Sequence, residues 1–384
     1  MNKEGRALER RRDVRRGEGG GLLRLSQVPL LLAVLAMTGC GSIGPGSVAR
    51  DRFDYTEAVA ESWKSQMLLN LVKIRYGDAP VFLDVGQIVA GYSFQRGASV
   101  TGSSSLFHIG PPPGVVVGSV GGSAQGTYND SPTITYAPLA GERFARSLMM
   151  PIPPSAILNV IQAGFSVDVV LRLTVQSVNG VDNRLVQLQY VRPANPEFYV
   201  LLREFRRIQA SGDIGVRLDL VDKEERLSLA FRPNLAAAVE NAGLNIAKML
   251  GLDPAAREFR VVYGAVAAND KEIALLTRSI REVLVDLSSA IAVPHAHVAE
   301  RRVGPTPGGE VGPEGPVPPL VRIASSADRP SDTFVAVPYR GYWFSIDDRD
   351  MASKNLFSFI MFLFTFVETG TKEAAPVLTI PTTR

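Results

Sequence analysis

The chain has one cysteine, Cys40, among its 384 residues. A single thiol forms no internal disulfide, so the fold must be stabilised by an apolar core. Cys40 also follows an apolar block of about ten residues, residues 28–37. A block of this length is typical of a signal-peptide core and is too short to cross a bilayer as a helix.

The residues around the apolar block match a known processing signal. Residues 1–39 carry eight Lys and Arg, and Thr38 and Gly39 stand directly before Cys40. This arrangement resembles the lipobox of bacterial lipoproteins, with Met37 where that family prefers leucine. The resemblance implies that residues 1–39 are removed and that Cys40 is acylated. The alternative is a buried cysteine behind an ordinary secretory signal.

The residues after the cysteine indicate which membrane carries the anchor. Lipoproteins with aspartate directly after the acylated cysteine tend to stay in the inner membrane. In this sequence, Gly41 and Ser42 follow the cysteine instead. Acyl chains hold a protein stably, since each buried CH₂ contributes about 0.8 kcal/mol. We therefore expect an outer-membrane protein that binds membrane lipid through acylated Cys40, with its body facing the periplasm.

The charge balance argues against nucleic acid as a partner. The whole chain has a formal net charge of +3. Residues 1–39 contain eight basic and four acidic residues, a net charge of +4, so the rest of the chain has a net charge of −1. The mature chain therefore lacks the basic excess that nucleic-acid binding requires. Its remaining length of about 345 residues suffices for one large or two ordinary domains.

Composition divides the mature chain into distinct parts. Helical and strand patterns occur without regular βαβ alternation, which predicts an α+β fold of mixed helices and antiparallel hairpins. The expected parts are an acylated tether (40–54), an α+β body (55–302) with a Gly/Ser-rich insertion (97–130), a disordered Pro/Gly linker or loop (303–320), and a C-terminal hairpin, helix and strand (321–384).

Apolar spacing and caps predict the helices of the body. Residues 55–76 carry an apolar stripe at helical spacing, and shorter helices are expected at 141–150 and 155–163. A further helix is expected between Asn195, as its N-cap, and Gly212.

Two segments of the body are harder to interpret. Residues 167–175 alternate as a strand does, with a helix capped by Ser166 as the alternative, and Asn179-Gly180 predicts a hairpin turn. Asn269 followed by Glu272 matches a capping box and predicts a helix there. Its inner stripe would be Leu276, Ile280, Leu284, Leu287 and Ile291.

Hairpins are expected at residues 215–231 and 334–346. A buried core helix should follow from about Asp348, because its apolar run of twelve residues is short of the roughly 20 needed to cross hydrocarbon. Residues 376–381 are expected to form a final strand. Residues 132–153 and 339–364 are similar to stretches of an uncharacterised bacterial lipoprotein family, a resemblance that implies no activity.

The Gly/Ser-rich insertion predicts either a long mobile loop in the periplasm or a pair of glycine-punctuated strands. Residues 92–104 and 126–138 have lengths near the roughly 9–11 residues of a tilted membrane strand. Some secretion lipoproteins oligomerise so that each subunit contributes such a hairpin to one outer-membrane channel. Against this interpretation, neither segment shows a continuous apolar face, and Arg96 would have to face a lumen. The loop is the favoured interpretation.

The candidate ligand-binding residues are few. His295 and His297 would lie on one side of a strand, as two zinc ligands can, but exposed loop histidines are the simpler interpretation because a zinc site needs further ligands. Asp347, Asp348 and Asp350 could hold a cation, although carboxylates before a helix usually cap it.

Arginines on the 195–212 helix are the last candidate surface. Arg203, Arg206 and Arg207 could bind anionic lipid or a partner, with a solvated helix face as the default interpretation.

No hydrolase, metalloprotease, nucleotide-binding or EF-hand motif occurs. The sequence thus predicts a non-enzymatic envelope lipoprotein, without a cofactor, that has a binding, structural or assembly role. It would act with a possible envelope protein partner or as an oligomer. The alternative is an oligomeric secretion or pore subunit that contributes β-hairpins to an outer-membrane channel.

Overall fold

The computed structural model describes residues 45–89, 92–106, 116–130, 133–187, 190–221, 224–232 and 236–368. Cys40 and the predicted strand at 376–381 lie outside these residues. The contacts divide the chain after Thr56, and of the first unit only residues 45–56 are described. The second unit, from Glu57 onward, contains the predicted body and the C-terminal segment together.

The first described element is a long helix, α2 (Pro45–Arg75), which begins within the predicted tether. Its second half has a buried stripe that includes Met67, Leu71 and Val72, in agreement with the predicted amphipathic helix. The helix ends before Gly77, which adopts a positive φ of 78° that favours glycine.

The core of the second unit is a six-stranded sheet in the order β6-β5-β12-β11-β10-β9. Only β11 and β12 pair in parallel; the other neighbours are antiparallel. The strands are β5 (Val175–Val178), β6 (Val181–Asp182), β9 (Ile214–Val221), β10 (Glu224–Phe231), β11 (Glu258–Tyr263) and β12 (Glu272–Thr277). The predicted hairpins at Asn179-Gly180 and at 215–231 are confirmed as β5–β6 and β9–β10.

Helices lie on this sheet and against one another. Asn195 caps α6, where its side chain accepts a hydrogen bond from the Glu197 backbone N–H, and Gly212 ends the helix in the left-handed region, as predicted. The helices are α3 (Glu142–Met149), α4 (Pro154–Gln162), α5 (Val167–Thr174), α6 (Pro196–Ser211), α7 (Ala237–Leu250), α8 (Ile280–Ser289) and α9 (His295–Ala299).

The strand predicted at 167–175 is wrong, and the helical alternative is confirmed by α5. The buried residues of this segment include Val167, Val170, Leu171 and Thr174. Residues at these intervals share one face of a helix, whereas in a strand they would be divided between both faces. The chain becomes extended only at Val175, where β5 begins.

The helix predicted from Asn269 is also wrong. Asn269 and Glu272 instead accept backbone hydrogen bonds in a turn that leads into β12. The capping box lies further along, at Ser279 and Glu282, and begins α8. The predicted stripe therefore starts on a strand, at Leu276, and enters a helix only at Ile280.

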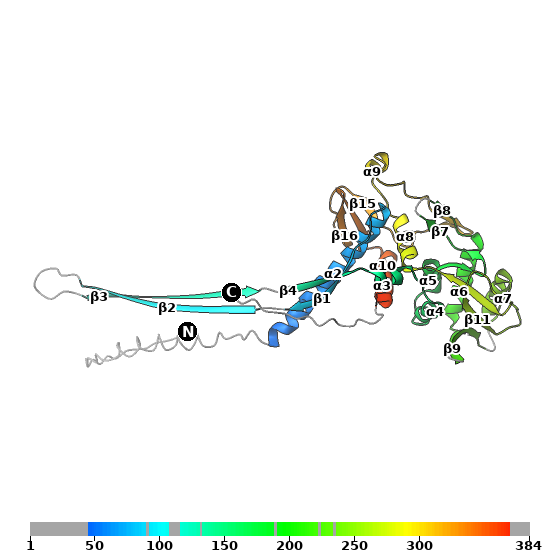
Figure 1. Cartoon of the computed structure of the whole chain (residues 1–384), viewed down its shortest axis with the longest axis horizontal. Coiled ribbons are helices and arrows are strands. Elements are labelled where there is room, and N and C mark those ends of the chain that lie inside the picture. Colours follow the sequence, from blue (N-terminus) through cyan, green and yellow to red (C-terminus); the bar gives the residue numbers. More distant parts are fainter. Residues whose placement is uncertain are drawn as a thin grey trace, which may run out of the picture. The chain divides into compact units, whose positions relative to one another are not determined.

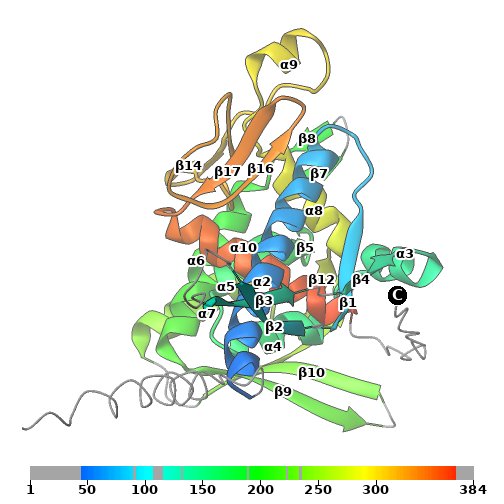
Figure 2. The ribbon, with the colours of Figure 1, turned by 90° about the vertical axis from the view of Figure 1, so that its left-hand side faces the viewer.

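The C-terminal part contains β13 (Glu310–Gly312), β14 (Gly315–Val317), β15 (Ala324–Ser326), β16 (Thr333–Tyr339), β17 (Tyr342–Asp347) and α10 (Met351–Glu368). The predicted hairpin is β16–β17, which lies against α2 (Figure 2). The apolar run of α10 is largely buried, as predicted. The segment 303–320 was expected to be disordered but contains the paired strands β13 and β14.

Two further ladders lie between α2 and α3 in the chain. Strand β1 (Phe82–Val89) pairs with β4 (Thr133–Leu139), and β2 (Tyr92–Leu106) pairs with β3 (Val116–Asp130). A short pair, β7 (Leu185–Gln187) and β8 (Tyr190–Arg192), completes the described strands. The predicted α+β class is confirmed.

Candidate functional site

The Gly/Ser-rich insertion contains a long antiparallel hairpin. Strands β2 and β3 are each 15 residues long and pair along their whole length, from Tyr92 opposite Asp130 to Leu106 opposite Val116 (Figure 1). Of the two interpretations of this region, glycine-punctuated strands are therefore correct, and the loop expected over 97–130 is wrong for its described residues. The second predicted segment, 126–138, was misplaced, because it combines the end of β3 with most of β4.

The register sorts the hairpin into two chemically different faces. Residues directly opposite each other share a face, and alternate residues of one strand share that face too. The even-numbered face carries Tyr92, Phe94, Arg96, Ala98, Val100, Gly102, Ser104 and Leu106, opposite Val116, Gly118, Val120, Gly122, Ala124, Gly126, Tyr128 and Asp130. The odd-numbered face carries only Ser, Thr, Gln, Asn and Gly apart from Val117.

The even-numbered face contains a band of small and apolar residues. The band holds five register pairs, from Ala98 opposite Ala124 to Leu106 opposite Val116, with Ser104 as its one hydroxyl residue, and it spans nine residues of each strand. Nine residues of strand span ~30 Å, or about 23 Å when tilted by ~40°, close to the ~25 Å apolar band of membrane strands. The band does not extend over the whole of the predicted segments 92–104 and 126–138, because Arg96 and Asp130 lie on the same face within them.

Aromatic residues and the two charged residues of this face, Arg96 and Asp130, lie at one end of the band. Phe94 and Tyr128 form a directly opposed pair, and Tyr92 lies one position further on the same face. Aromatic girdles mark the interfaces of membrane strands, and a long Arg side chain tolerates that depth better than the midplane. Arg96 thus lies on the even-numbered face just outside the band, and not on the polar face, where a channel would need it to face a lumen.

The polar face is hydroxyl-rich, and its residues include the exposed Ser99, Thr101, Ser123 and Thr127. The Ser99 and Ser123 Oγ atoms lie 2.7 Å apart, within hydrogen-bond distance. In the register, no charged residue occupies this face of β2 or β3. Such a face suits contact with water.

Both edges of the hairpin lack a strand partner among the described residues, since β2 and β3 pair only with each other. Unpaired edges present rows of free N–H and C=O groups, and a two-stranded ladder is marginally stable alone. The hairpin is therefore suited to pairing with further strands on either side.

The neighbouring ladder β1–β4 also has an apolar face. The register of β1–β4 shifts at a bulge between Val85 and Gln87. This face carries only apolar residues, all at least partly exposed: Leu83, Val85, Ile88, Ile134, Tyr136 and Pro138.

The structure separates the two candidate histidines. They lie in the short helix α9, where His295 is exposed and His297 is buried beside Tyr76. Neither the predicted strand nor a pair of exposed loop residues is found. No group of three His, Cys, Asp or Glu side chains that could hold a metal ion occurs among the described residues.

The three candidate aspartates surround the start of α10. Asp350 accepts hydrogen bonds from the Ser353 backbone N–H (3.1 Å) and hydroxyl (2.8 Å), which hold its pKa below the usual range. Asp347 accepts from the Arg349 N–H, and Asp348 pairs with Lys354 at 2.6 Å. The Asp350 contacts fit the capping interpretation, whereas Asp347 accepts within the turn before the helix and Asp348 forms an ion pair.

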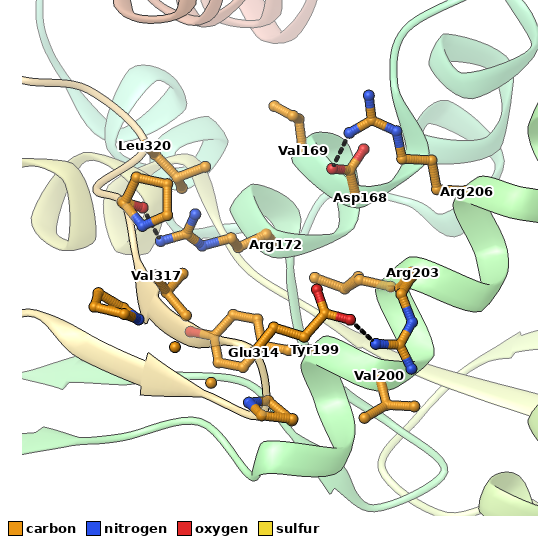
Figure 3. A pocket seen from close by; sticks show the side chains of 16 residues that line it. Asp168, Val169, Arg172, Tyr199, Val200, Arg203, Arg206, Glu314, Val317 and Leu320 are labelled. Atoms are coloured by element: carbon orange, nitrogen blue, oxygen red, sulfur yellow. Dashed lines mark hydrogen bonds and ion pairs between the residues drawn. The ribbon is translucent and has the colours of Figure 1, made fainter.

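A pocket of about 470 Å³ lies between α5, α6 and the segment 312–320 (Figure 3). We call it the arginine pocket, because Arg172, Arg203 and Arg206 line it together with Tyr199. Arg207, the third arginine predicted for this surface, lies outside the pocket and pairs with the buried Glu204 at 3.0 Å. Arg172 was missed, since only the folded chain places α5 beside α6.

Each arginine of the pocket already has an oxygen partner. Arg172 donates to the Pro318 carbonyl at 2.8 Å, Arg206 pairs with Asp168 at 2.9 Å, and Arg203 pairs with Glu314. An anion could bind here only by replacing these partners.

A buried contact lies behind the pocket. Burial, together with the hydrogen bond from its hydroxyl to Glu310, raises the pKa of Tyr199, which keeps the phenol neutral at physiological pH. Glu310 also lies 3.9 Å from Arg184. This contact fixes β13 against α6 and supplies no nucleophile to the pocket.

No family model, curated protein or solved structure matches the chain. Within the described residues, no helix has the length and apolar character required to cross a membrane.

Proposed function

We propose that the protein is a lipid-anchored subunit of an oligomeric outer-membrane channel. Each copy would contribute the hairpin β2–β3 to a closed sheet, with the even-numbered face toward lipid and the odd-numbered face toward a water-filled lumen. The observation that carries this proposal is the register of the hairpin, which places a band of small and apolar residues on one face and hydroxyl and amide residues on the other.

The free edges of the hairpin support assembly from several copies. Backbone groups inside a bilayer must find partners within protein, because no water is present to satisfy them. A single hairpin leaves two edges unpaired, whereas hairpins arranged in a closed ring pair every edge with a neighbouring copy.

The predicted anchor is consistent with this arrangement. Acylated Cys40 would hold each copy at the outer membrane and raise the local concentration of hairpins there. The body would face the periplasm, and replacement of Cys40 by alanine should release the protein or leave an uncleaved precursor. Unchanged membrane retention of Cys40→Ala would contradict the anchor.

The first test is the native mass of the lipidated protein, extracted in mild detergent, combined with conductance in planar bilayers. A ring of many copies that conducts supports the proposal. A monomer or dimer without conductance refutes it.

A second candidate is a binding or assembly lipoprotein without a pore. It is favoured by the arginine pocket, whose volume of about 470 Å³ lies in the range of ligand sites. A non-conducting protein that co-purifies with an envelope partner would support this candidate instead.

A further inference from the structure

A second cavity, of about 350 Å³, lies between the central sheet and helices α4, α5 and α6. The strands contribute Val216, Leu229, Val261, Ile273 and Leu275, and the helices contribute further aliphatic side chains and Phe205. No charged side chain lines it.

The polar groups at this cavity are already engaged with the backbone. Gln209 accepts a hydrogen bond from the Val167 N–H at 2.9 Å and donates to the Phe165 carbonyl at 2.7 Å. Gln162, which is exposed, donates to the Val216 carbonyl at 3.3 Å. The interior of the cavity therefore favours a group that forms no hydrogen bonds.

The volume is large for a space inside a packed core. Interiors are close-packed, and a void forfeits the contacts of the atoms that line it. An apolar cavity of about 150 Å³ is enough to bind benzene, and this one is more than twice as large. Its strand side is buried, with Val261 and Leu275 only 5% and 4% exposed, whereas Gln162 and Gly164 at its helix side are exposed.

We propose that this cavity binds a hydrocarbon chain, supplied by a fatty acid or by the acyl chain of a lipid. The chain lies between the sheet and the helices, and the head group stays outside near the exposed Gln162. The site is separate from the hairpin and does not depend on the proposed channel.

The test is thermal unfolding of the full mature chain in amphipol, without free detergent, with octanoate, dodecanoate and hexadecanoate as probes. A ligand that binds only the folded protein raises the Tm as its concentration exceeds the Kd. We expect a shift that grows from octanoate to dodecanoate. A lysophospholipid with a dodecanoyl chain distinguishes the two sources: an equal shift assigns the site to the chain of any lipid, and a shift with dodecanoate alone assigns it to a free fatty acid.

Val261→Phe adds a ring at the wall of the cavity, narrows the space that a hydrocarbon chain would occupy, and provides the critical variant. We expect it to reduce the dodecanoate shift and to raise the Tm of the ligand-free protein by about 2–4 °C, since added apolar contacts in a void stabilise a core. A gain in stability together with weaker binding cannot arise from misfolding.

Val262→Phe is the matched control, because Val262 is the next residue of β11 and lies on the opposite face of the sheet. This variant should keep the dodecanoate shift. No shift with any probe in the wild-type protein, or an undiminished shift in Val261→Phe, would overturn the proposal.

Discussion

The hydroxyl oxygen of Tyr76 lies 2.7 Å from Nδ1 of His297, and both side chains are more than nine-tenths buried. The Tyr76 ring also packs edge-on against Tyr339 and Phe344. Tyr76 directly follows the last residue of α2, and its side chain therefore connects that helix to α9 and to the hairpin β16–β17.

Tyr76→Phe should destabilise the protein by about 1–3 kcal/mol, because the ring stays in place while the buried His297 nitrogen loses its partner. Urea unfolding of the two proteins measures this difference. Tyr342→Phe is the control, since the Tyr342 ring also packs on His297 but no hydrogen bond of its hydroxyl is found in the described structure. A Tyr76→Phe protein as stable as the Tyr342→Phe protein would contradict the role of the contact.

Two neighbouring residues of β3 test the orientation of the hairpin. Val120 lies on the apolar face and Ser119 on the polar face. A cationic side chain facing lipid near the midplane costs about 2–4 kcal/mol, whereas one in a lumen is tolerated. Val120→Lys should therefore abolish conductance in planar bilayers, and Ser119→Lys should conduct. The opposite result would reverse the assignment of the faces.

The polar face also predicts the ion selectivity of the proposed channel. Rings of charged side chains select ions by sign, and none occupies this face in β2 or β3. The reversal potential in a salt gradient should therefore lie near zero, and Ser123→Asp should shift it toward cation preference. A wild-type channel that conducts with strong preference for one sign would show that residues outside β2 and β3 control permeation.

Arg278 is 2% exposed and pairs with the buried Asp286 at 3.1 Å, and it also donates to the Leu173 carbonyl. Arg278→Met should cost about 3–5 kcal/mol, because Asp286 keeps only the more distant Arg184, at 3.6 Å. Chemical denaturation provides the measurement. The double variant Arg278→Met/Asp286→Leu should recover part of the loss; no recovery would mean that the guanidinium acts mainly through backbone carbonyls.

Asp350 makes stability depend on pH. Its pKa is lowered in the folded state by hydrogen bonds from Ser353, so the unfolded chain, with a carboxyl pKa of about 3.9, binds its proton more readily. The stabilisation is present above that value and is lost as pH falls through the lowered pKa. Asp350→Asn keeps an acceptor for the cap but cannot titrate, so its free energy of unfolding should fall less steeply at acidic pH.

Asp350→Ala serves as the comparison for the cap itself. It should lose about 1 kcal/mol at neutral pH, because the Ser353 N–H loses its acceptor. Parallel pH profiles for Asp350→Asn and the wild-type protein would show that other carboxylates control the acid transition.

Elements that carry their own boundary signals could be predicted from the sequence. Asn195 and Gly212 lie at the ends of α6 as expected, and Asn179-Gly180 forms a hairpin turn with both residues at positive φ. In each case the side chain or the backbone freedom of the residue itself determines the local structure.

The false capping box at Asn269 shows where local reasoning fails. The same residue types that cap a helix also accept backbone N–H groups in a turn, and neighbouring strands decide which structure forms. β12 pairs with both β5 and β11, which lie far apart in the sequence, so no local pattern could reveal it.

The candidate sites could not be predicted from the sequence, because they depend on pairing between residues far apart in the chain. Alternation within residues 92–106 is visible in the sequence, but residues 116–126 are rich in glycine and lack the β-branched pattern of a strand. Only the register places Val116 and Val120 on the face of Val100 and Leu106. The burial of His297 likewise follows from Tyr76, which lies 221 positions earlier in the chain.

If the proposed channel forms, the unpaired edges of β2–β3 also determine when the membrane becomes permeable. A solitary hairpin in the bilayer would leave backbone groups unsatisfied on both sides, so a newly anchored copy gains little by inserting alone. Permeability on this scheme appears only when enough copies meet to complete the ring. The number of copies in the membrane would then determine whether a pore forms, and a single copy of the proposed subunit would not make the membrane permeable.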